Sequence, residues 1–492
     1  MNTAAPLTHP AGVVTAPRSR HRGLRRPGLG GRRLGGRHWL LAGLLVLAVS
    51  ALVVVLTGIR PSYDGFGFLV WGRQVLHWNL NTDGAPSWKP LPFLFTLPYA
   101  IAGQVQMWLW MLTAVAGALG GAVFAARVAH RLTGASPGRR FAPFVAGAFA
   151  AVGVLGIGTY SHLVLIANSD PLIVAMCLAA IDCHLSRRPK LAFTMLVLAS
   201  LGRPEAWVFA GLYAIWSWRT VPSMRVLVVL GLALIPVFWF TIPALTSHSW
   251  FIAGDLALNQ STTIHGNKIL GVISRLRSLY ELPMQLACLF GILLAALRRD
   301  RVTLGVAGAA VVWVAVEIAF AYHGWSAVSR YMIEPAAVMV VVAAGAVGRL
   351  LAETPSRVAL RWVGPVAVLV LLVALAPAAS SRVRTAHAEI LKARAAATRI
   401  NRLENVIDRD GGVRRIRSCG QPVSQIGFQS TLAWELHMNV GNVGYNPGHA
   451  INQGAPMVLF QPHKLGWRVR PYNLPKEDEA RCSGLKADTD FN

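Results

Sequence analysis

Long uncharged apolar runs dominate this sequence and decide the solvent in which the chain folds. The runs from Leu40 to Thr57, from Val226 to Leu245 and from Trp362 to Pro377 carry no charged residue. Each is about as long as a tilted helix needs to cross roughly 30 Å of hydrocarbon. Because a backbone in lipid must satisfy its own hydrogen bonds, helices are the structures these runs predict. We therefore expect an α-helical polytopic membrane protein.

About eleven transmembrane helices are predicted. They are expected at residues 39–58, 105–127, 141–159, 170–185, 190–202, 206–218, 225–245, 283–297, 302–322, 332–351 and 362–379. Residues 91–103 are a candidate re-entrant segment, so the count is open by about two spans. An odd number puts the two ends of the chain on opposite sides of the membrane.

The distribution of positive charge predicts the topology. The net charge of +26 would suggest nucleic acid as a partner of a soluble protein. Here residues 1–38 hold eight arginines and no acid, and further basic clusters fall at every second gap between apolar runs. Since cytoplasmic loops carry the excess of Lys and Arg, the N-terminus is expected in the cytoplasm and the C-terminus outside, in the plasma membrane. We expect membrane lipids, and no nucleic acid, as partners.

Three regions follow from this pattern. Residues 1–38 form a basic cytoplasmic segment, residues 39–379 a transmembrane domain with an outer loop at 59–104, and residues 380–492 an extracytoplasmic C-terminal domain. In the tail, helical spacing predicts a helix from Arg382 to Asp408. Short apolar stretches at Val413–Ile416, Met457–Phe460 and Trp467–Val469 predict strands, so the tail is expected to be a small α/β domain.

The five cysteines fall into two groups, one in the predicted transmembrane domain and one in the predicted C-terminal domain. Cys177, Cys183 and Cys288 fall inside predicted spans, where a free thiol behaves as a small apolar group. Cys419 and Cys482 are the only pair in the tail, and an oxidising exterior permits them to form a disulfide. No Cys or His spacing in the chain indicates a zinc site.

The first outer loop offers the main candidate for chemistry. Asp64 follows Tyr63 shortly after the first span and precedes an aromatic-rich stretch. A partly desolvated carboxylate there would accept a proton from a hydroxyl group; the alternative is that Asp64 caps a helix starting near Gly65. Further along, Lys89 would bind a phosphate, and Trp88 would stack on a sugar or belong to the interfacial aromatic belt.

Charged residues at other outer span ends are further candidates. Arg203-Pro204-Glu205 joins two short apolar runs; it marks a functional cavity or is a structural ion pair that closes a helical hairpin. Arg330, followed by Tyr331, would bind a phosphate bidentately or anchor the span at the interface. Asp170 precedes a proline and is a second binding candidate or a helix N-cap.

In order, these features resemble the GT-C superfamily of membrane glycosyltransferases, especially the actinobacterial arabinosyl- and mannosyltransferases. The similarity consists of a basic N-terminus, one span, an outer loop with an early acid (Asp64), a Pro- and aromatic-rich continuation (Ser87 to Pro98), and later the Arg-Pro-Glu turn and Arg330-Tyr331. It covers about residues 39–379, followed by an outer domain such as many members have.

The resemblance implies transfer of a sugar from a polyprenyl-phosphate-sugar donor to an envelope glycan or lipid acceptor on the outer face. It makes Asp64 the general base and Lys89, Arg203 and Arg330 the candidates for binding the lipid phosphate, with Tyr63, Trp88, Asp170, Glu205 and Tyr331 around the substrate. The family often has two acids in this loop, whereas Tyr63-Asp64-Gly65 has one. No cofactor is therefore assigned, and participation of a divalent cation stays open.

Two other functions are consistent with the sequence. A transporter or flippase of lipid-linked sugars would also place charges within the membrane, although it should carry polar residues through its depth and often two related halves. A non-catalytic envelope-assembly protein would use the tail to bind a partner, with Asp64 only a helix cap. An Asp64 variant that keeps its function would favour the assembly protein.

Overall fold

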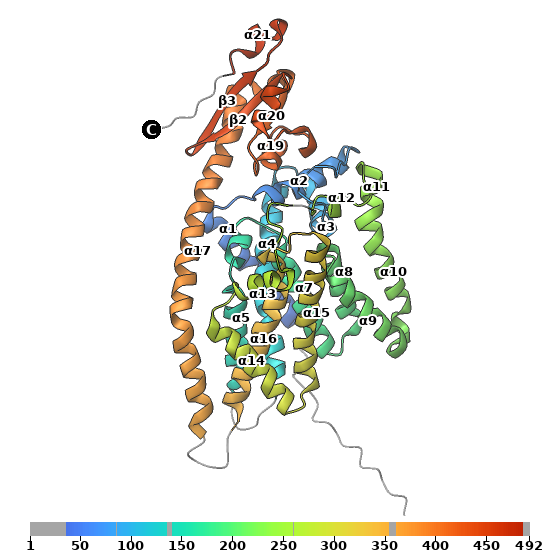
Figure 1. The fold of residues 1–492 in the computed structure, drawn as a ribbon, viewed down its shortest axis with the longest axis vertical. Helices are drawn as coiled ribbons and strands as arrows, with labels where there is room; N and C mark the ends of the chain where they lie inside the picture. Colours follow the sequence, from blue (N-terminus) through green and yellow to red (C-terminus); the bar gives the residue numbers. More distant parts are fainter. Residues whose placement is uncertain (1–35, 85, 135–139, 259, 354–360, 486–492) are drawn as a thin grey trace, which may run out of the picture.

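The computed structural model describes residues 36–84, 86–134, 140–258, 260–353 and 361–485. An elongated array of helices carries a small α/β domain at one end (Figure 1). Of the predicted basic segment 1–38, only the last three residues belong to this described part. The last residues of the predicted C-terminal domain, 486–492, also lie outside it.

Six helical stretches in the described ranges are long and apolar enough to cross a membrane. They are α1 (Gly36–Thr57), α4 (Val105–Thr133), a stretch through α10 (Pro222–Thr246), α15 (Arg301–His323), η4 with α16 (Ser329–Ala352) and α17 (Val363–Arg409). Helices α13 (Lys268–Arg277) and α14 (Leu282–Leu297), bent by 104°, add a seventh if they form one span. The chain is thus a membrane protein.

Other predicted spans are present as shorter helices. These are α5 (Ala142–Leu155), α7 (Asp170–Leu185), α8 (Pro189–Gly202), α9 (Ala206–Thr220) and α14, each of 14 to 16 residues. A helix of that length falls short of the roughly 20 residues that span a bilayer. The count of eleven crossings therefore stays a prediction.

Helix α16 lies at the centre of the array. Of its most apolar 18-residue stretch, 83% is buried inside the protein. The corresponding shares are 11% for α1 and 6% for α17, so these two helices lie at the periphery. Small residues permit this central position, because they allow helix backbones to approach closely. At Gly348, an added Cβ would lie 2.1 Å from the hydroxyl oxygen of Thr133 on α4.

The predicted outer loop 59–104 is largely helical. It contains α2 (Tyr63–Leu76), α3 (Pro90–Tyr99) and the 3₁₀ turn η1 (Ala100–Ala102), so the candidate re-entrant residues 91–103 form a short apolar helix. The rings of Trp71 and Trp88 pack with their centroids 4.9 Å apart, and both are fully buried. This aromatic core fixes the position of the loop that carries Asp64.

Helix α17 joins the last span to the C-terminal domain without a break (Figure 1). Its 47 residues rise about 70 Å. The span at 362–379 and the tail helix at Arg382–Asp408 were predicted as separate elements, but Ala378–Ser381 contains neither glycine nor proline to end a helix. The predicted domain boundary at 379/380 consequently falls inside one helix.

The C-terminal domain contains a three-stranded sheet in the order β1-β2-β3. Strand β1 (Gln421–Ser424) runs parallel to β2 (Met457–His463), which pairs antiparallel with β3 (Gly466–Tyr472). Two of the predicted strands are therefore present. The prediction of a strand at Val413–Ile416 was wrong, because these residues form helix α18 (Gly412–Ser418). Val413 and Ile416 are three apart, which is a helical spacing.

Short helices complete the chain. They are α6 (Tyr160–Leu165), η2 (Pro222–Met224), α10 (Arg225–Pro236), η3 (Val237–Thr241), α11 (Ile242–Thr246), α12 (Ile252–Asp255), η4 (Ser329–Met332), α19 (Gln429–Glu435), η6 (Val440–Asn442), α20 (Pro447–Asn452) and α21 (Lys476–Cys482). The longer central helix α16 spans Ile333–Ala352. Cys419, directly after α18, forms a disulfide with Cys482 at the end of α21. Helix α19 packs on α2, so the C-terminal domain rests on the outer loop.

Candidate active site

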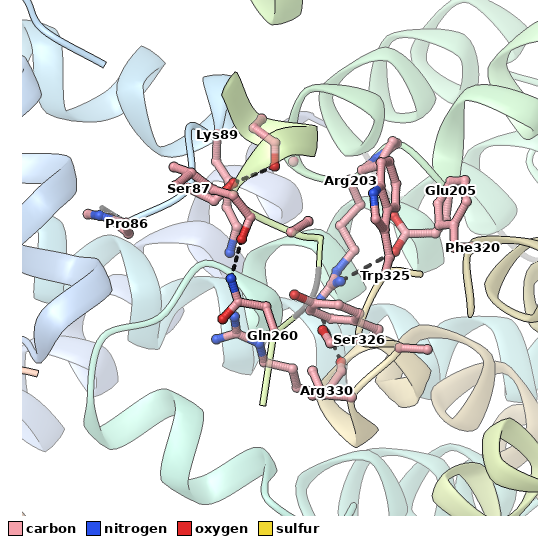
Figure 2. Close-up of a pocket in the computed structure, with 18 of the residues that line it drawn as sticks. Pro86, Ser87, Lys89, Arg203, Glu205, Gln260, Phe320, Trp325, Ser326 and Arg330 are labelled. Carbon is pink, nitrogen blue, oxygen red and sulfur yellow. Dashed lines mark hydrogen bonds and ion pairs between the residues drawn. The ribbon is translucent and has the colours of Figure 1, made fainter. Parts of the chain in front are cut away.

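A cavity of about 740 Å³ opens among α2, α6, α9, α12 and α15 and the turns beside them. Figure 2 shows Lys89 and Ser87 on one side of it, Arg203, Glu205 and Trp325 on the other, and Arg330 below them. Eight of the nine predicted catalytic and binding residues line this cavity: Tyr63, Asp64, Trp88, Lys89, Arg203, Glu205, Arg330 and Tyr331. The ninth, Asp170, contacts the cavity residue Arg203 from behind.

Asp64 faces two cations. Its Oδ2 accepts hydrogen bonds from Asn168 Nδ2 and from Arg330 Nη1, each at 3.2 Å, and Lys89 Nζ lies 4.0 Å away. Asp64 is the second residue of α2, and Ser62 occupies the N-cap position, so the capping alternative does not describe its place. The carboxylate is held toward the cavity by these contacts.

Lys89 and Arg330 have hydrogen-bonding capacity left. Lys89 immediately precedes α3, and within the described residues its buried Nζ has no hydrogen-bond partner. The same holds for Nε of Arg330. Two cations facing a single carboxylate leave excess positive charge, which favours binding of an anion such as a phosphate group.

Arg203 has a different environment. Its guanidinium contacts the carboxylates of Asp170, Glu205 (3.5 Å) and Glu334 (3.2 Å), and these side chains are all at most 5% exposed. Pro204 favours an extended conformation at Arg203, which ends α8 and starts the turn into α9. Arg203 is therefore surrounded by negative charge and links α7, the α8–α9 turn and α16, which agrees with the structural alternative.

The same cluster defines the role of Asp170. Ser169 is the N-cap of α7 and Asp170 is its first residue, followed by a proline that suits this position. The Asp170 carboxylate is fully buried against Arg203. Asp170 thus contacts the cavity only through Arg203.

The aromatic candidates differ in accessibility. Trp88 is fully buried, and its Nε1 donates to the carbonyl oxygen of Phe238, so its ring is available neither for stacking on a sugar nor for an interfacial belt. The ring of Tyr331 lies under Arg203, with 4.2 Å between the guanidinium carbon and the ring centroid. Tyr63 begins α2, where burial and the neighbouring Asp64 raise the pKa of its hydroxyl group.

Sequence reasoning missed Asn168 as a member of the site and assigned no role to the span-end residue Glu334. Asn168, which lies just before α7, donates a hydrogen bond to the Asp64 carboxylate. The Glu334 carboxylate forms an ion pair with Arg203. Both stand next to singled-out residues, Asn168 beside Ser169-Asp170 and Glu334 shortly after Tyr331. The sequence feature that could have identified both residues is the presence of charged and amide side chains at the ends of neighbouring spans.

Within the described part of the chain, no three His, Cys, Asp or Glu side chains are grouped so that they could hold a metal ion.

The sequence matches no known family model and no curated protein. The fold, however, is similar to that of ArnT from Cupriavidus metallidurans bound to undecaprenyl phosphate, with a TM-score of 0.51 and 13% identity. That similarity covers 92% of this chain and 100% of the other chain. The apo structure of the same protein gives a TM-score of 0.51 at 14% identity, with coverages of 92% and 99%.

The chain has the ArnT fold. The predicted similarity to the GT-C superfamily is supported at the level of the fold alone. The more specific similarity to arabinosyl- and mannosyltransferases stays a prediction. At this low identity the ArnT fold assigns no residue roles, which must come from the contacts described above.

Proposed function

We propose that the protein is an integral membrane glycosyltransferase that moves a sugar from a polyprenyl-phosphate donor to a cell-envelope glycan or glycolipid. The observation that carries this proposal is the position of Asp64, which faces the cavity between Lys89 and Arg330. Proton acceptor and phosphate-binding cations then lie side by side. That ArnT binds undecaprenyl phosphate in a similar fold supports a lipid phosphate as the leaving group.

The proposed reaction is a single displacement with inversion at the anomeric carbon. The acceptor oxygen forms a bond to this carbon while the bond between the carbon and the phosphate oxygen breaks. The acceptor proton passes to Asp64, and the electron pair of the broken bond leaves with the lipid phosphate. Lys89 and Arg330 stabilise the charge that develops on the phosphate. A phosphate is a good leaving group, so one carboxylate suffices.

The proposed orientation puts the reaction on the outer face of the plasma membrane. The positive-inside pattern favours an extracytoplasmic C-terminal domain, and this domain packs through α19 on α2, the helix that carries Asp64. The cavity would then face outward beneath the C-terminal domain. Arabinose and mannose are the sugars that the sequence resemblance favours.

Transfer of radiolabelled sugar from polyprenyl-phosphate donors to envelope glycan tests the proposal. Membranes containing wild-type protein, Asp64→Asn or Asp83→Asn are compared at equal amounts of protein. Asp83 is the matched control, since it lies in the same loop but pairs with His248. Activity lost only in Asp64→Asn supports the transferase; equal activity in all three removes Asp64 as the base. Absence of transfer from any donor favours transport or assembly.

A further inference from the structure

A buried carboxyl group lies in the wall of the cavity. Glu317 belongs to α15, is fully buried and lines the cavity. In the described structure neither of its carboxyl oxygens receives a hydrogen bond. An unsatisfied buried polar group is costly, and a carboxylate especially so. Its position in the cavity wall therefore indicates a ligand with hydrogen-bond donors.

Glu205 extends this acidic part of the cavity. Its carboxyl group lies close enough to that of Glu317 for a proton to be shared between them. One oxygen of Glu205 lies 3.5 Å from Arg203, and the other has no partner among the described residues. Even with a shared proton, one oxygen of Glu317 remains free to accept a hydrogen bond.

An aromatic wall adjoins the two acids and adds a donor. The ring of Trp325 packs on Phe320 at 4.5 Å and stacks with Phe251 at 6.3 Å between centroids. All three side chains line the cavity. The indole N–H of Trp325 is buried and, as far as the structure describes the chain, has no acceptor. This part of the cavity thus combines apolar faces with an unused donor and unused acceptors.

These groups suit one part of the proposed donor. A phosphate would be repelled by Glu205 and Glu317, and a prenyl chain would leave their oxygens and the indole N–H unpaired. A sugar ring has hydroxyl groups that donate and accept, and apolar C–H faces for an aromatic wall. We propose that Glu317, Glu205 and Trp325 form the subsite for the sugar ring of the donor, an inference that rests on the proposed function.

Two groups of cavity residues are therefore expected to bind different parts of the donor, one the phosphate and the other the sugar ring. Lys89 and Arg330 lie beside Asp64, which would receive the acceptor proton. Glu205 and Trp325 lie across the cavity from Lys89 (Figure 2), and Glu317 neighbours Glu205. A lipid phosphate without a sugar would use only the first group. The subsite consequently changes the affinity for the sugar-bearing lipid and leaves the affinity for the bare lipid phosphate unaffected.

The test measures binding to the full-length protein in nanodiscs. The probes are undecaprenyl phosphate and undecaprenyl phosphate carrying arabinose, mannose or glucose. The variants are Glu317→Gln, which keeps the shape but replaces the carboxyl group by an amide, and Trp325→Phe, which keeps a ring and removes the N–H. Glu353→Gln and Trp250→Phe are the matched controls: Glu353 pairs with Arg298 at an exposed position, and Trp250 is 61% exposed.

We expect at least one sugar-bearing lipid to bind wild-type protein more tightly than undecaprenyl phosphate. Glu317→Gln and Trp325→Phe should weaken that binding by about 10- to 100-fold and leave undecaprenyl phosphate binding unchanged. An unchanged preference for the sugar-bearing lipid in both variants, or no such preference in wild-type protein, overturns the subsite. Failure of wild-type protein to bind undecaprenyl phosphate at all instead contradicts the proposed function itself.

Discussion

Arg330 Nη1 donates to Asp64 Oδ2 across 3.2 Å, which joins the start of α16's span to the first turn of α2. Lys89 stands on the other side of the same oxygen, at 4.0 Å. A general base and the cations that bind the leaving group thus form one electrostatic unit. Changing the base and changing a cation should nevertheless have opposite effects on binding.

Lys89→Met should weaken binding of undecaprenyl phosphate by about 10- to 100-fold, because hydrogen bonds to charged groups contribute about 1.5–3 kcal/mol. Asp64→Asn should leave this binding unchanged or tighter, since it removes a negative charge beside the phosphate, while transfer falls by about 10²- to 10⁴-fold. Calorimetry and the transfer assay measure the two effects. Lys190→Met, at the exposed start of α8, is the control. Weaker binding in Asp64→Asn would contradict this division of roles.

Arg203→Ala should lower the free energy of unfolding by about 3–5 kcal/mol, since it leaves the buried carboxylates of Asp170, Glu205 and Glu334 without their cation. Arg298→Ala is the matched control: its partner Glu353 is 43% exposed, and such pairs contribute about 0–1 kcal/mol. Chemical unfolding in detergent compares the two. Equal losses of stability would show that the Arg203 cluster is not a structural centre.

Apolar runs predicted the fold well because a bilayer leaves the backbone few structures. The starts and ends of α1, α8 and α15 lie within a few residues of the predicted spans, since Pro, Gly and charged residues bound the runs. The secondary structure of the C-terminal domain was harder to predict. At Val413–Ile416 a run of four residues fits a strand or one turn of helix, and only packing against the rest of the domain decides between them.

For the candidate site, the sequence predicted which residues take part but not which contacts they make. Span-end position was enough to single out Asp64, Lys89 and Arg330, because charges near the membrane are costly and seldom incidental. It could not separate Arg330 from Arg203, because both lie at outer ends of predicted spans. Their roles differ because Arg203 contacts, besides the neighbouring Glu205, the carboxylates of Asp170 on α7 and Glu334 on α16, and such long-range pairing leaves no local pattern.

Removal of the disulfide should destabilise the C-terminal domain. Cys419 and Cys482 are 63 residues apart, so by loop-closure entropy their bond contributes about 4 kcal/mol. The double variant Cys419→Ser, Cys482→Ser should therefore be cleaved faster within the sheet by limited proteolysis. Cys183→Ser, outside the domain, is the control. Equal cleavage of the double variant and wild-type protein would contradict the prediction.

Two titratable groups at the contact between α19 and α2 have shifted pKa values. Arg73 on α2 donates to the carbonyl oxygens of Trp434 (2.9 Å) and Ala433 (3.1 Å). Beside it, burial and the negative charge of Glu404 raise the pKa of Glu435 to about 7. Burial and Arg73 lower the pKa of His437. The two shifts affect stability in opposite directions, so a variant is needed to isolate either one.

Glu435→Gln should isolate the carboxyl group. Because the folded-state pKa of about 7 exceeds the ordinary value of 4.5, the folded protein binds the proton more tightly than the unfolded chain. The contribution of Glu435 is therefore fully present below pH 4.5 and is lost as the pH rises through about 7. Gln remains neutral, so the variant should gain stability relative to wild-type protein between pH 5 and pH 8, while the His437 contribution cancels in the comparison. Thermal unfolding in detergent at these pH values measures the difference. A stability difference that does not change with pH would show that Glu435 is ionised at the α2–α19 contact throughout this range.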